Sequence, residues 1–476
     1  MPGLSEVQVD ELPPERFEAV LDAPQWEALS AANARAREIF AGRRIISVNS
    51  TAAGGGVAEM LQSLVAYGRG AGVDARWYVI EGTPGFFELT KRLHHHLHGS
   101  LGDGGPLGPA EREIYDAVTA ANLEQLARDV QAGDVVLLHD PQTAGLAAGL
   151  RELGAHVVWR SHIGIDEPND AVRAAWAFLL PYVEHADAFI FTRRAYVPPE
   201  LLHRDVTMIP PSIDVFSQKN NDLTAERVDA ILKTAGIIAG EPTAQPLYVH
   251  RDGRTGVVHH RAEMTQDEPI QPDDPLVVQV SRWDPLKDPL GVMYGFAEHV
   301  APRVPGARLL LAGPSPVGVT DDPEGGVVLE QLIATHAGLL PEVRARVHIA
   351  SLPMADHGEN AAMVNAIQRH AAVIVQKSLA EGFGLTVAEA MWKSRAVVAS
   401  RVGGIQDQIL DGGGILLDDP ADLAAYGDAV AGLLEDPERA RRMGEAAHER
   451  VRAEFLGARH LIQYLELFAR LIAADD

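Results

Sequence analysis

The sequence of 476 residues contains no cysteine. This absence excludes disulfide bonds and thiolate metal sites, and it is typical of a reducing compartment. Basic residues are also scarce, since 66 acidic side chains outnumber 41 basic ones and give a formal net charge of -25. Because nucleic-acid binding needs a basic footprint, the composition argues against a nucleic-acid partner.

The sequence also lacks membrane and export signals. No apolar run approaches the roughly 18 residues of a membrane-spanning helix. The N-terminal segment MPGLSEVQVDELPPERFEAV is acidic and contains proline, unlike a signal peptide. We therefore expect a cytoplasmic protein without membrane association, and a chain of this length predicts at least two domains.

Short apolar runs rich in β-branched residues alternate with longer amphipathic stretches, which is typical of parallel, doubly wound α/β sheets. The first series of runs is RIISVNS, ARWYVIEG, DVVLLHD, HVVWRSH, AFIFT and VTMIPPS. The second series is LVVQVSR, ARLLLAG, RVHIASL, AAVIVQKS and AVVASRVGG. The two series predict two Rossmann-like lobes.

We expect an N-terminal lobe over residues 1–225 and a C-terminal lobe over residues 275–454, separated by a linker or insertion over residues 226–274. Within the linker, the stretch 240–274 is rich in Pro, Asp, Gly and His and has little helical periodicity. It is predicted to be an insertion or mobile surface segment. The last helix, about 455–476, is expected to join the N-terminal lobe.

Ligands of doubly wound sheets bind beyond the carboxyl ends of the strands. After the first strand, Gly54, Gly55 and Gly56 precede an amphipathic helix. Glycines there allow a phosphate or sugar oxygen to approach the backbone closely, although a tight strand-to-helix turn explains them equally well. The run is not a dinucleotide fingerprint, because GxGxxG is absent.

Polar side chains follow two other strands of the first lobe. LLHDPQ carries His139, Asp140 and Gln142, and VVWRSHIG carries Arg160 and His162. Such a histidine is often only a structural hydrogen-bond donor. Two strand ends that face one cleft nevertheless favour a binding site.

The run HHHLH, residues 94–98, resembles a metal-binding sequence. It lies in one predicted helix and has no carboxylate at a useful spacing. We favour a solvated helix face with one ring turned inward, and we predict no protein-bound metal.

In the second lobe, VVQVSRWDPLKDP places Arg282 and Lys287 just past a strand. The two cations suit a diphosphate, which Arg binds with its planar fork and Lys with a point charge. The alternative is a pair of surface cations in salt bridges with Asp284 and Asp288.

The segment QKSLAEGFGLTVAEAMWKS contains a strand, Glu381, a Gly-Phe-Gly loop and a helix with Glu389. A glycine-bearing loop before a helix favours an anion, and two carboxylates can bracket hydroxyl groups. Thr386 and Glu389 also have capping-box spacing, which is a structural alternative for Glu389. The two carboxylates, Glu381 and Glu389, are a specific signal only together with the glycines, Arg282 and Lys287.

These residues resemble the donor site of retaining GT-B glycosyltransferases, which carry R-x4-K and E-x7-E in the C-terminal lobe. Within that GT4-like group, the chain looks like the trehalose glycosyltransferring synthases, which transfer glucose reversibly from a nucleotide sugar to free glucose. The likeness runs from about residue 45 to 460. It is carried by FFELTKRLHHHLHG, LLHDPQT, VVWRSHIGIDEPN, AYVPPEL, IPPSIDVFSQKN, QVSRWDPLKD, DDPEGG, VNAIQRHA, EGFGLTVAEAMWK and VGGIQDQI.

The resemblance implies a GT-B fold of two Rossmann-like doubly wound lobes with an interlobe cleft, and a retaining hexosyltransferase activity. It implies that Arg282 and Lys287 neutralise the leaving diphosphate, that Glu381 holds donor-glucose hydroxyls, that Glu389 holds the ribose and that His162 lies beside the transferred sugar. Further implied donor-binding residues are Gly55, Gly56, Gly382, Phe383, Gly384, Leu385 and Thr386. The implied acceptor-binding residues are Lys91, His94, His139, Asp140, Gln142 and Arg160.

The implied partners are ADP-, UDP- or GDP-glucose and a small sugar acceptor, and a homodimer is compatible with the resemblance. No tightly bound cofactor is implied, although Mg²⁺ can accompany the nucleotide diphosphate. The sequence departs from the family pattern at Gly164, where an Asp is expected, and in the long stretch 240–274.

Three alternatives stay open at this point. A trehalose phosphorylase would use inorganic phosphate in place of a nucleotide. Gly164 keeps a retaining transferase for another small polyol or an aminocyclitol in consideration. A binding regulator without enzymatic activity is disfavoured, because the Arg, the Lys and both Glu residues are intact.

Overall fold

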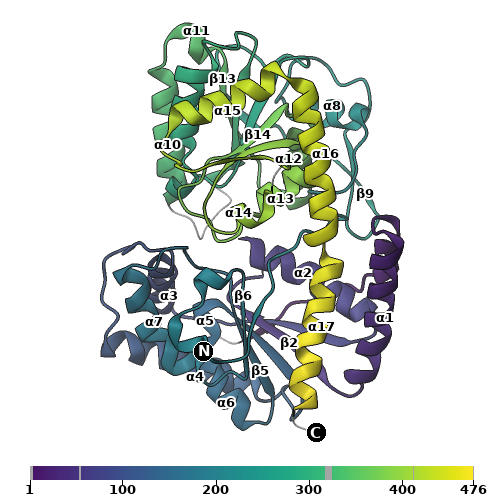
Figure 1. The fold of residues 1–476 in the computed structure, drawn as a ribbon, viewed down its shortest axis with the longest axis vertical. Helices are drawn as coiled ribbons and strands as arrows, with labels where there is room; N and C mark the ends of the chain where they lie inside the picture. Colours follow the sequence, from purple (N-terminus) through teal and green to yellow (C-terminus); the bar gives the residue numbers. More distant parts are fainter. Residues whose placement is uncertain (1–3, 53–54, 317–323, 411, 475–476) are drawn as a thin grey trace. The chain divides into compact units, whose positions relative to one another are not determined.

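The computed structural model describes residues 4–52, 55–316, 324–410 and 412–474. Gly54 and residues 321–323 of the DDPEGG segment lie outside these ranges. The chain divides into two compact units, of which the first comprises Met1–Ser212 and Phe455–Asp476 and the second Ile213–Glu454. Each unit has its own seven-stranded sheet (Figure 1). Within the described ranges, no helix has both the length and the apolar character needed to cross a membrane.

The sheet of the first unit has the strand order β1-β3-β2-β4-β5-β6-β7. Its strands are parallel except β1, which pairs antiparallel with β3. The order reverses between β2 and β4, so these two strands form the topological switch point where doubly wound sheets bind ligands. The strands are β1 (Ser5–Glu6), β2 (Arg44–Asn49), β3 (Asp74–Val79), β4 (Val135–His139), β5 (His156–Ser161), β6 (Ala188–Phe191) and β7 (Val206–Met208).

Alternate residues of these strands enter two separate cores, because successive side chains of a strand point to opposite faces. Ile46 and Val136 pack with one set of helices, whereas Ile45 and Leu137 pack with the other. The first set is α3 (Pro84–Leu97), α4 (Pro109–Leu126), α6 (Ala147–Glu152) and α7 (Asp170–Val183). The second set is α1 (Ala23–Ile39), α2 (Gly55–Gly70) and α17 (Gly457–Ala473). Shorter helical turns are η1 (Pro14–Ala19), α5 (Asp140–Thr143), η2 (Ala144–Leu146), η3 (Arg194–Tyr196) and η4 (Pro199–Leu201).

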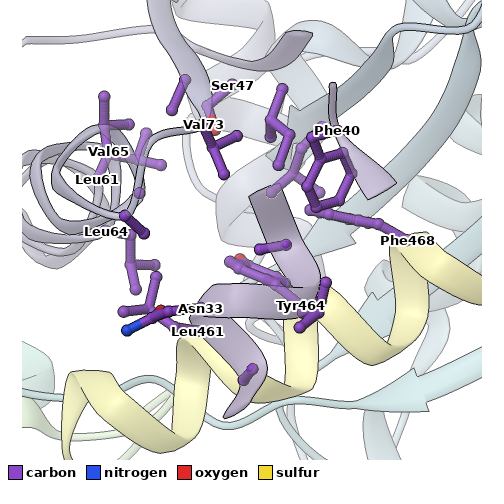
Figure 2. Close-up of a pocket in the computed structure, with 18 residues that line it drawn as sticks. Asn33, Phe40, Ser47, Leu61, Leu64, Val65, Val73, Leu461, Tyr464 and Phe468 are labelled. Carbon is purple, nitrogen blue, oxygen red and sulfur yellow. The ribbon is translucent and has the colours of Figure 1, made fainter. Parts of the chain in front are cut away.

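An apolar cavity lies between α1, α2, α17 and the sheet of the first unit (Figure 2). Its volume is about 80 Å³. Phe40, Leu64, Tyr464 and Phe468 are among the residues that line it. The rings of Tyr464 and Phe468 stack with their centroids 5.3 Å apart. The helices therefore cover this face of the sheet without filling the space beneath them completely.

The sheet of the second unit has the order β10-β13-β12-β11-β14-β15-β16, with β10 antiparallel to β13 and the other pairs parallel. Its switch point lies between β11 and β14. The strands are β10 (Glu263–Thr265), β11 (Leu276–Val280), β12 (Arg308–Pro314), β13 (Val347–Leu352), β14 (Val373–Gln376), β15 (Ala396–Ser400) and β16 (Ile415–Leu417). A separate hairpin consists of β8 (Leu247–Val249) and β9 (Thr255–Val257).

Helices cover both faces of this second sheet as well. One core contains Val277, Leu309 and Val375 together with side chains of α9, η6, α10, α15 and α16. On the other face, α12 contacts β11 and α8. The helices are α8 (Ala225–Thr234), α9 (Pro289–Gly295), the π-helical turn η6 (Phe296–Val300), α10 (Glu324–Ala337), α11 (Pro341–Arg344), α12 (His357–His370), α13 (Leu385–Trp392), α14 (Ile405–Gln408), α15 (Leu423–Glu435) and α16 (Pro437–Glu454), with the 3-10 turn η5 (Pro285–Lys287).

The stretch 240–274, predicted to be an insertion or mobile surface segment, belongs to the second unit and contributes to its core. Val258 and Ile270 are fully buried, and Tyr248 is nearly so. β10 forms the edge strand beside β13. The polar composition hid this role, because the stretch is anchored by a few separated apolar residues and not by a continuous apolar run.

Candidate active site

Two histidines meet at the carboxyl ends of β4 and β5 in the first unit. His139 Nδ1 lies 3.0 Å from His162 Nε2, and the two rings stack with an interplanar angle of 13°. His139 Nε2 is buried without a partner among the described residues. Because buried N–H groups rarely lack an acceptor, the proton of His139 belongs on Nδ1, from which it donates to His162.

Asp140 follows His139 and holds the start of the loop that follows β5. Its Oδ1 accepts a hydrogen bond of 2.8 Å from the backbone N–H of His162. Its φ of 62° is left-handed, a strained conformation for a non-glycine residue. Burial raises the pKa of Asp140 to about 7. Burial and the charge of Arg160 lower the pKa of His139 and His162 well below 6.5, so both rings are neutral at pH 7.

Arg160, predicted to bind the acceptor, is turned toward α17 and is 0% exposed. Its Nη1 donates to the hydroxyl of Tyr464 and lies 2.8 Å from His460 Nε2, and its Nη2 donates to the carbonyl of Ile209. His460 Nδ1 in turn lies 2.9 Å from the hydroxyl of Ser212. These contacts make Arg160 a structural residue that connects β5 to α17. Its guanidinium is not exposed at a surface.

The other residues predicted in the first unit occupy helix ends and surfaces. Gly55, with a φ of 77°, begins α2, and both it and Gly56 are exposed. Lys91 and His94 lie on α3, which contacts α5, the turn that carries Gln142. Within the HHHLH run, His96 is the buried ring, as the sequence predicted for one of these histidines.

Gly164, where an Asp is expected, is packed against an aromatic ring. A Cβ atom at this position would lie 2.2 Å from Cγ of Tyr196. Any larger residue would displace the ring, so the missing carboxylate follows from the packing of η3 against this loop.

In the second unit, the predicted cations follow β11 at the switch point. Lys287 forms an ion pair with Glu381, which follows β14, and both side chains are mostly buried. Arg282 is half-exposed and lies 3.7 Å from Asp284. The salt-bridge alternative therefore describes Arg282 in part, but Lys287 pairs across the switch point with the predicted sugar-binding carboxylate.

Asp288 pairs with Lys377, a residue that the sequence analysis did not select. Lys377 is 0% exposed, and its Nζ also donates to the carbonyl of Pro420 at 2.6 Å. Asp288 has a φ of 49° and caps α9 by accepting from the N–H of Gly291. The buried pair fixes the backbone next to Lys287. A lysine at the end of a buried strand was the available sequence signal.

The Gly-Phe-Gly loop is held by contacts with the segment that follows β15. Gln408 Nε2 donates to the carbonyl of Phe383 at 2.5 Å, and the N–H of Gly404 donates to the carbonyl of Gly382. Gly384 has a φ of 86°, and an added Cβ would lie 2.9 Å from Ile405. A glycine is therefore required where α13 begins.

Gly384, not Thr386, is the N-cap of α13, so Glu389 does not serve as the carboxylate of a capping box. The hydroxyl of Thr386 instead donates a hydrogen bond to the side-chain oxygen of Gln376. Glu389 is nearly buried and forms an ion pair of 3.6 Å with Lys219. Burial lowers the pKa of Lys393, which lies one turn away and donates to the carbonyl of Glu389. Glu389 thus has a defined position, with its side chain paired to Lys219 and its carbonyl bonded to Lys393.

Within its own unit, each switch point gathers a distinct chemistry. The first unit brings together His139, Asp140 and His162, which form a hydrogen-bonding cluster with two neutral rings. The second unit brings together Lys287 and Glu381, near Arg282 and the glycine loop that leads into α13 at Leu385. The second arrangement suits an anionic group attached to a polyhydroxylated one.

Comparison with known proteins agrees with this chemistry. The family profile "Glycosyl transferases group 1" matches residues 260–450, and "Trehalose synthase, N-terminal domain" matches residues 47–198. The solved α,α-trehalose 6-phosphate synthase from Burkholderia multivorans superimposes with a TM-score of 0.64 at 16% identity, covering 91% of this chain and 99% of that chain. The chain is a glycosyltransferase with the GT-B fold.

Curated relatives define the family more closely. The chain is 37% identical to the trehalose synthase of Rubrobacter xylanophilus over 434 residues, which cover 90% of this chain and 91% of that protein. A trehalose phosphorylase of Pleurotus sajor-caju is more distant, at 28% identity over 90% of this chain and 57% of that protein. The chain therefore belongs to the trehalose synthase family and is a hexosyltransferase.

Proposed function

We propose that this protein makes trehalose by transferring glucose, with retention, from a nucleoside diphosphate glucose to free glucose, in a reversible reaction. The observation that carries the proposal is the Lys287–Glu381 pair beside Arg282 at the β11/β14 switch point. There, cations and a carboxylate can meet the diphosphate and the sugar of one donor molecule.

In this proposal, Arg282 and Lys287 bind the diphosphate, and Glu381 accepts hydrogen bonds from the hydroxyls of the donor glucose. Glu389 binds the ribose hydroxyls. The amides around Gly382–Leu385 and those of Gly55 and Gly56 add backbone donors for anionic oxygens. In this proposal, cationic side chains and backbone N–H groups stabilise the charge of the leaving group.

For the first unit, we propose that His162 lies beside the transferred glucose and that Lys91, His94, His139, Asp140 and Gln142 bind the acceptor. A neutral His162 can donate a hydrogen bond from Nδ1 without adding positive charge next to an oxocarbenium-like carbon. The low pKa of this ring supports such a role.

The transfer step that we propose takes place on one face of the sugar. The bond between the anomeric carbon and the diphosphate oxygen breaks, the bond to the acceptor oxygen forms, and the acceptor proton passes to the departing phosphate oxygen. Arg282 and Lys287 stabilise the charge that develops on the diphosphate. Mg²⁺ would enter with the nucleotide as its counterion, and in this proposal Arg282 and Lys287 bind the phosphates directly.

The test is a screen of ADP-, UDP- and GDP-glucose with free glucose, with the product identified by the anomeric signals in its NMR spectrum. We expect α,α-trehalose and a nucleoside diphosphate. A product formed only with another polyol would show that this polyol, and not glucose, is the acceptor. Absence of transfer from every donor would overturn the proposal.

The phosphorolytic alternative is tested in the reverse direction. Trehalose is incubated either with a nucleoside diphosphate or with inorganic phosphate. We expect nucleotide glucose from the first mixture, whereas glucose 1-phosphate from the second would show that the protein is a phosphorylase.

A further inference from the structure

The β8–β9 hairpin lies within the stretch 240–274, to which the proposed function assigns no role. Its turn is closed by a hydrogen bond of 2.7 Å from the N–H of His250 to the carbonyl of Arg254, and Gly253 has the left-handed φ of 90° that the turn requires. Tyr248 and Val258 anchor the hairpin in the second unit, where both are buried. The hairpin therefore has a fixed conformation and a fixed base.

Three hydrogen bonds connect the hairpin to the 214–221 loop. Arg251 Nε donates to Asp214 Oδ2 at 2.6 Å, and the Asp214 side chain is only 5% exposed. Gln218 Nε2 lies 3.1 Å from His250 Nδ1. Asn221 Nδ2 donates to the carbonyl of Val249 at 2.7 Å. The contacts fall on both sides of Lys219, so the hairpin holds the loop at either end of the residue that approaches the donor site.

The same loop reaches the helix that carries Glu389. Lys219 Nζ lies 3.6 Å from Glu389 Oε1. The neighbouring Asn220 accepts hydrogen bonds from Trp392 Nε1 and Lys393 Nζ, both of which belong to the C-terminal end of α13. Asp214 also shapes the loop from within, since its carbonyl accepts from Ser217 and Asn220. A displacement of Asp214 would therefore also displace Lys219.

The other side of the loop is held independently of the hairpin. Asn365 of α12 donates to the carbonyls of Gln218 and Asn221, and Arg369 donates to Asn221 as well. The base of the hairpin is tied to the same helix, because Glu359 accepts from the backbone N–H groups of His259 and His260. Loss of the Arg251 contact would leave the loop and the hairpin attached, and its effect would be local.

We propose that the β8–β9 hairpin is a brace that positions Lys219 against Glu389, and that Arg251 is thereby a positioning residue for nucleotide binding. The inference rests on the proposed role of Glu389 as the ribose-binding carboxylate. A correctly placed Lys219 orients the Glu389 carboxylate, because the ion pair favours one position of this buried side chain. The brace sets the affinity for the donor and leaves the chemical step unchanged.

The test compares Arg251→Met with the matched control Arg254→Met. Arg254 lies in the same turn, and its side chain is 79% exposed and bonded to Asp252 of that turn. KM for the best donor of the nucleotide-glucose screen, KM for glucose, kcat and the thermal midpoint are measured for each. We expect Arg251→Met to raise the donor KM about fivefold to tenfold, with kcat and the acceptor KM unchanged, and Arg251→Lys to restore part of the loss. The control should match the wild type.

A double-mutant comparison links the effect to Lys219. The donor KM of Arg251→Met combined with Lys219→Met should not exceed that of Lys219→Met alone, because both changes act on one contact. Additive effects would overturn the brace. Should Arg251→Met fail to fold, Asp214→Asn, which keeps the size of the side chain but removes the charge that pairs with Arg251, replaces it with the same expected result.

The outcomes separate this inference from the proposed function. If Glu389→Gln leaves the donor KM unchanged, the ribose assignment fails and the brace fails with it. If Glu389→Gln raises the donor KM but Arg251→Met does not, the brace alone is overturned. A fall in thermal midpoint with both KM values raised together would assign the hairpin a purely structural role.

Discussion

Two consecutive residues at the end of η5, the turn that follows β11, enter two different ion pairs. Lys287 pairs with Glu381, and Asp288 pairs with the fully enclosed Lys377. The second pair holds the backbone in the left-handed conformation at Asp288, which directs the preceding lysine toward β14. A buried charge must be paired to remain charged, so the Asp288–Lys377 pair is as necessary as the Lys287–Glu381 pair that we propose for donor binding.

At this scale, we predict that Arg282→Ala and Lys287→Ala each lower kcat by about two to three powers of ten, because each removes a preorganised charge from the leaving diphosphate. Steady-state turnover with the best nucleotide-glucose donor measures the effect. Arg441→Ala, which removes an exposed cation of α16, should leave kcat unchanged. Near-normal turnover of either site variant would contradict the assignment.

Buried histidines predict acid sensitivity of the first unit. The pKa values of His96, His139, His162 and His460 are all lowered by burial, so the folded state resists their protonation. Their contribution to stability is present above pH 6.5 and is lost as the pH falls below it, by up to about 1.4 kcal/mol per pH unit for each histidine. Asp140 acts in the opposite sense: with a pKa of about 7 it stabilises the protonated folded form, and this contribution is lost as the pH rises toward 7.

The histidines outnumber the single carboxyl group, so we expect net destabilisation of the first unit between pH 6.5 and 5. Hydrogen exchange of β5 amides at a series of pH values measures it. The slope of the opening free energy against pH reports the number of protons taken up on unfolding. His139→Gln should lower this number by about one. A β5 stability that rises as the pH falls through this window would contradict the prediction.

Among the elements, α2 offers a direct test of the cavity in Figure 2. Gly68 lines that cavity, and a Cβ added there meets only the Cβ of Ala75, at 3.4 Å. Gly68→Ala should raise the free energy of unfolding by about 0.5–1 kcal/mol, because Ala favours the helix and fills part of the space.

Gly70→Ala on the same helix is the matched control. Its Cβ would lie 1.8 Å from the carbonyl oxygen of Leu12, so this change should be destabilising. The midpoints of chemical denaturation of the two variants measure the difference. Equal effects of both substitutions would show that helix propensity alone is at work.

Both sheets were predictable from sequence because their strands are covered on two faces and therefore form continuous apolar runs. β2 to β7 and β11 to β15 all coincide with predicted runs. β1, β10, β16 and the β8–β9 hairpin were missed, since each strand has only two or three residues. The places of β1 and β10 also depend on partners that are distant in sequence. The edge pairings of β1 and β10 are antiparallel, which the βα alternation does not indicate.

Site positions were predictable to the extent that they follow strand ends. Arg282, Lys287 and Glu381 follow β11 and β14, and the topology brings those strands together. The partners were not predictable, because contacts such as His460 with Arg160 join residues that are 300 positions apart. The capping alternative for Glu389 failed because the left-handed Gly384 moved the start of the helix by two residues.

For the whole molecule, the proposal predicts that a nucleoside diphosphate alone protects the second unit. Binding at 100 times Kd stabilises the form that binds by about 2.7 kcal/mol. Hydrogen exchange should slow mainly around β11, β14 and α13, and in the first unit only near the start of α2. Protection confined to the β4 and β5 ends of the first unit would contradict the division of donor and acceptor binding.

The place of α17 has a consequence for how the protein is made. This helix covers Leu137, Val158 and Ile190 of the first unit, yet it is translated after the whole of the second unit. Domains generally fold in the order in which the ribosome releases them. Here the second unit can complete its fold while one apolar face of the first unit still awaits α17. The unit that is translated first is completed last, and the part of its sheet that α17 covers is the surface that a nascent-chain chaperone would need to protect.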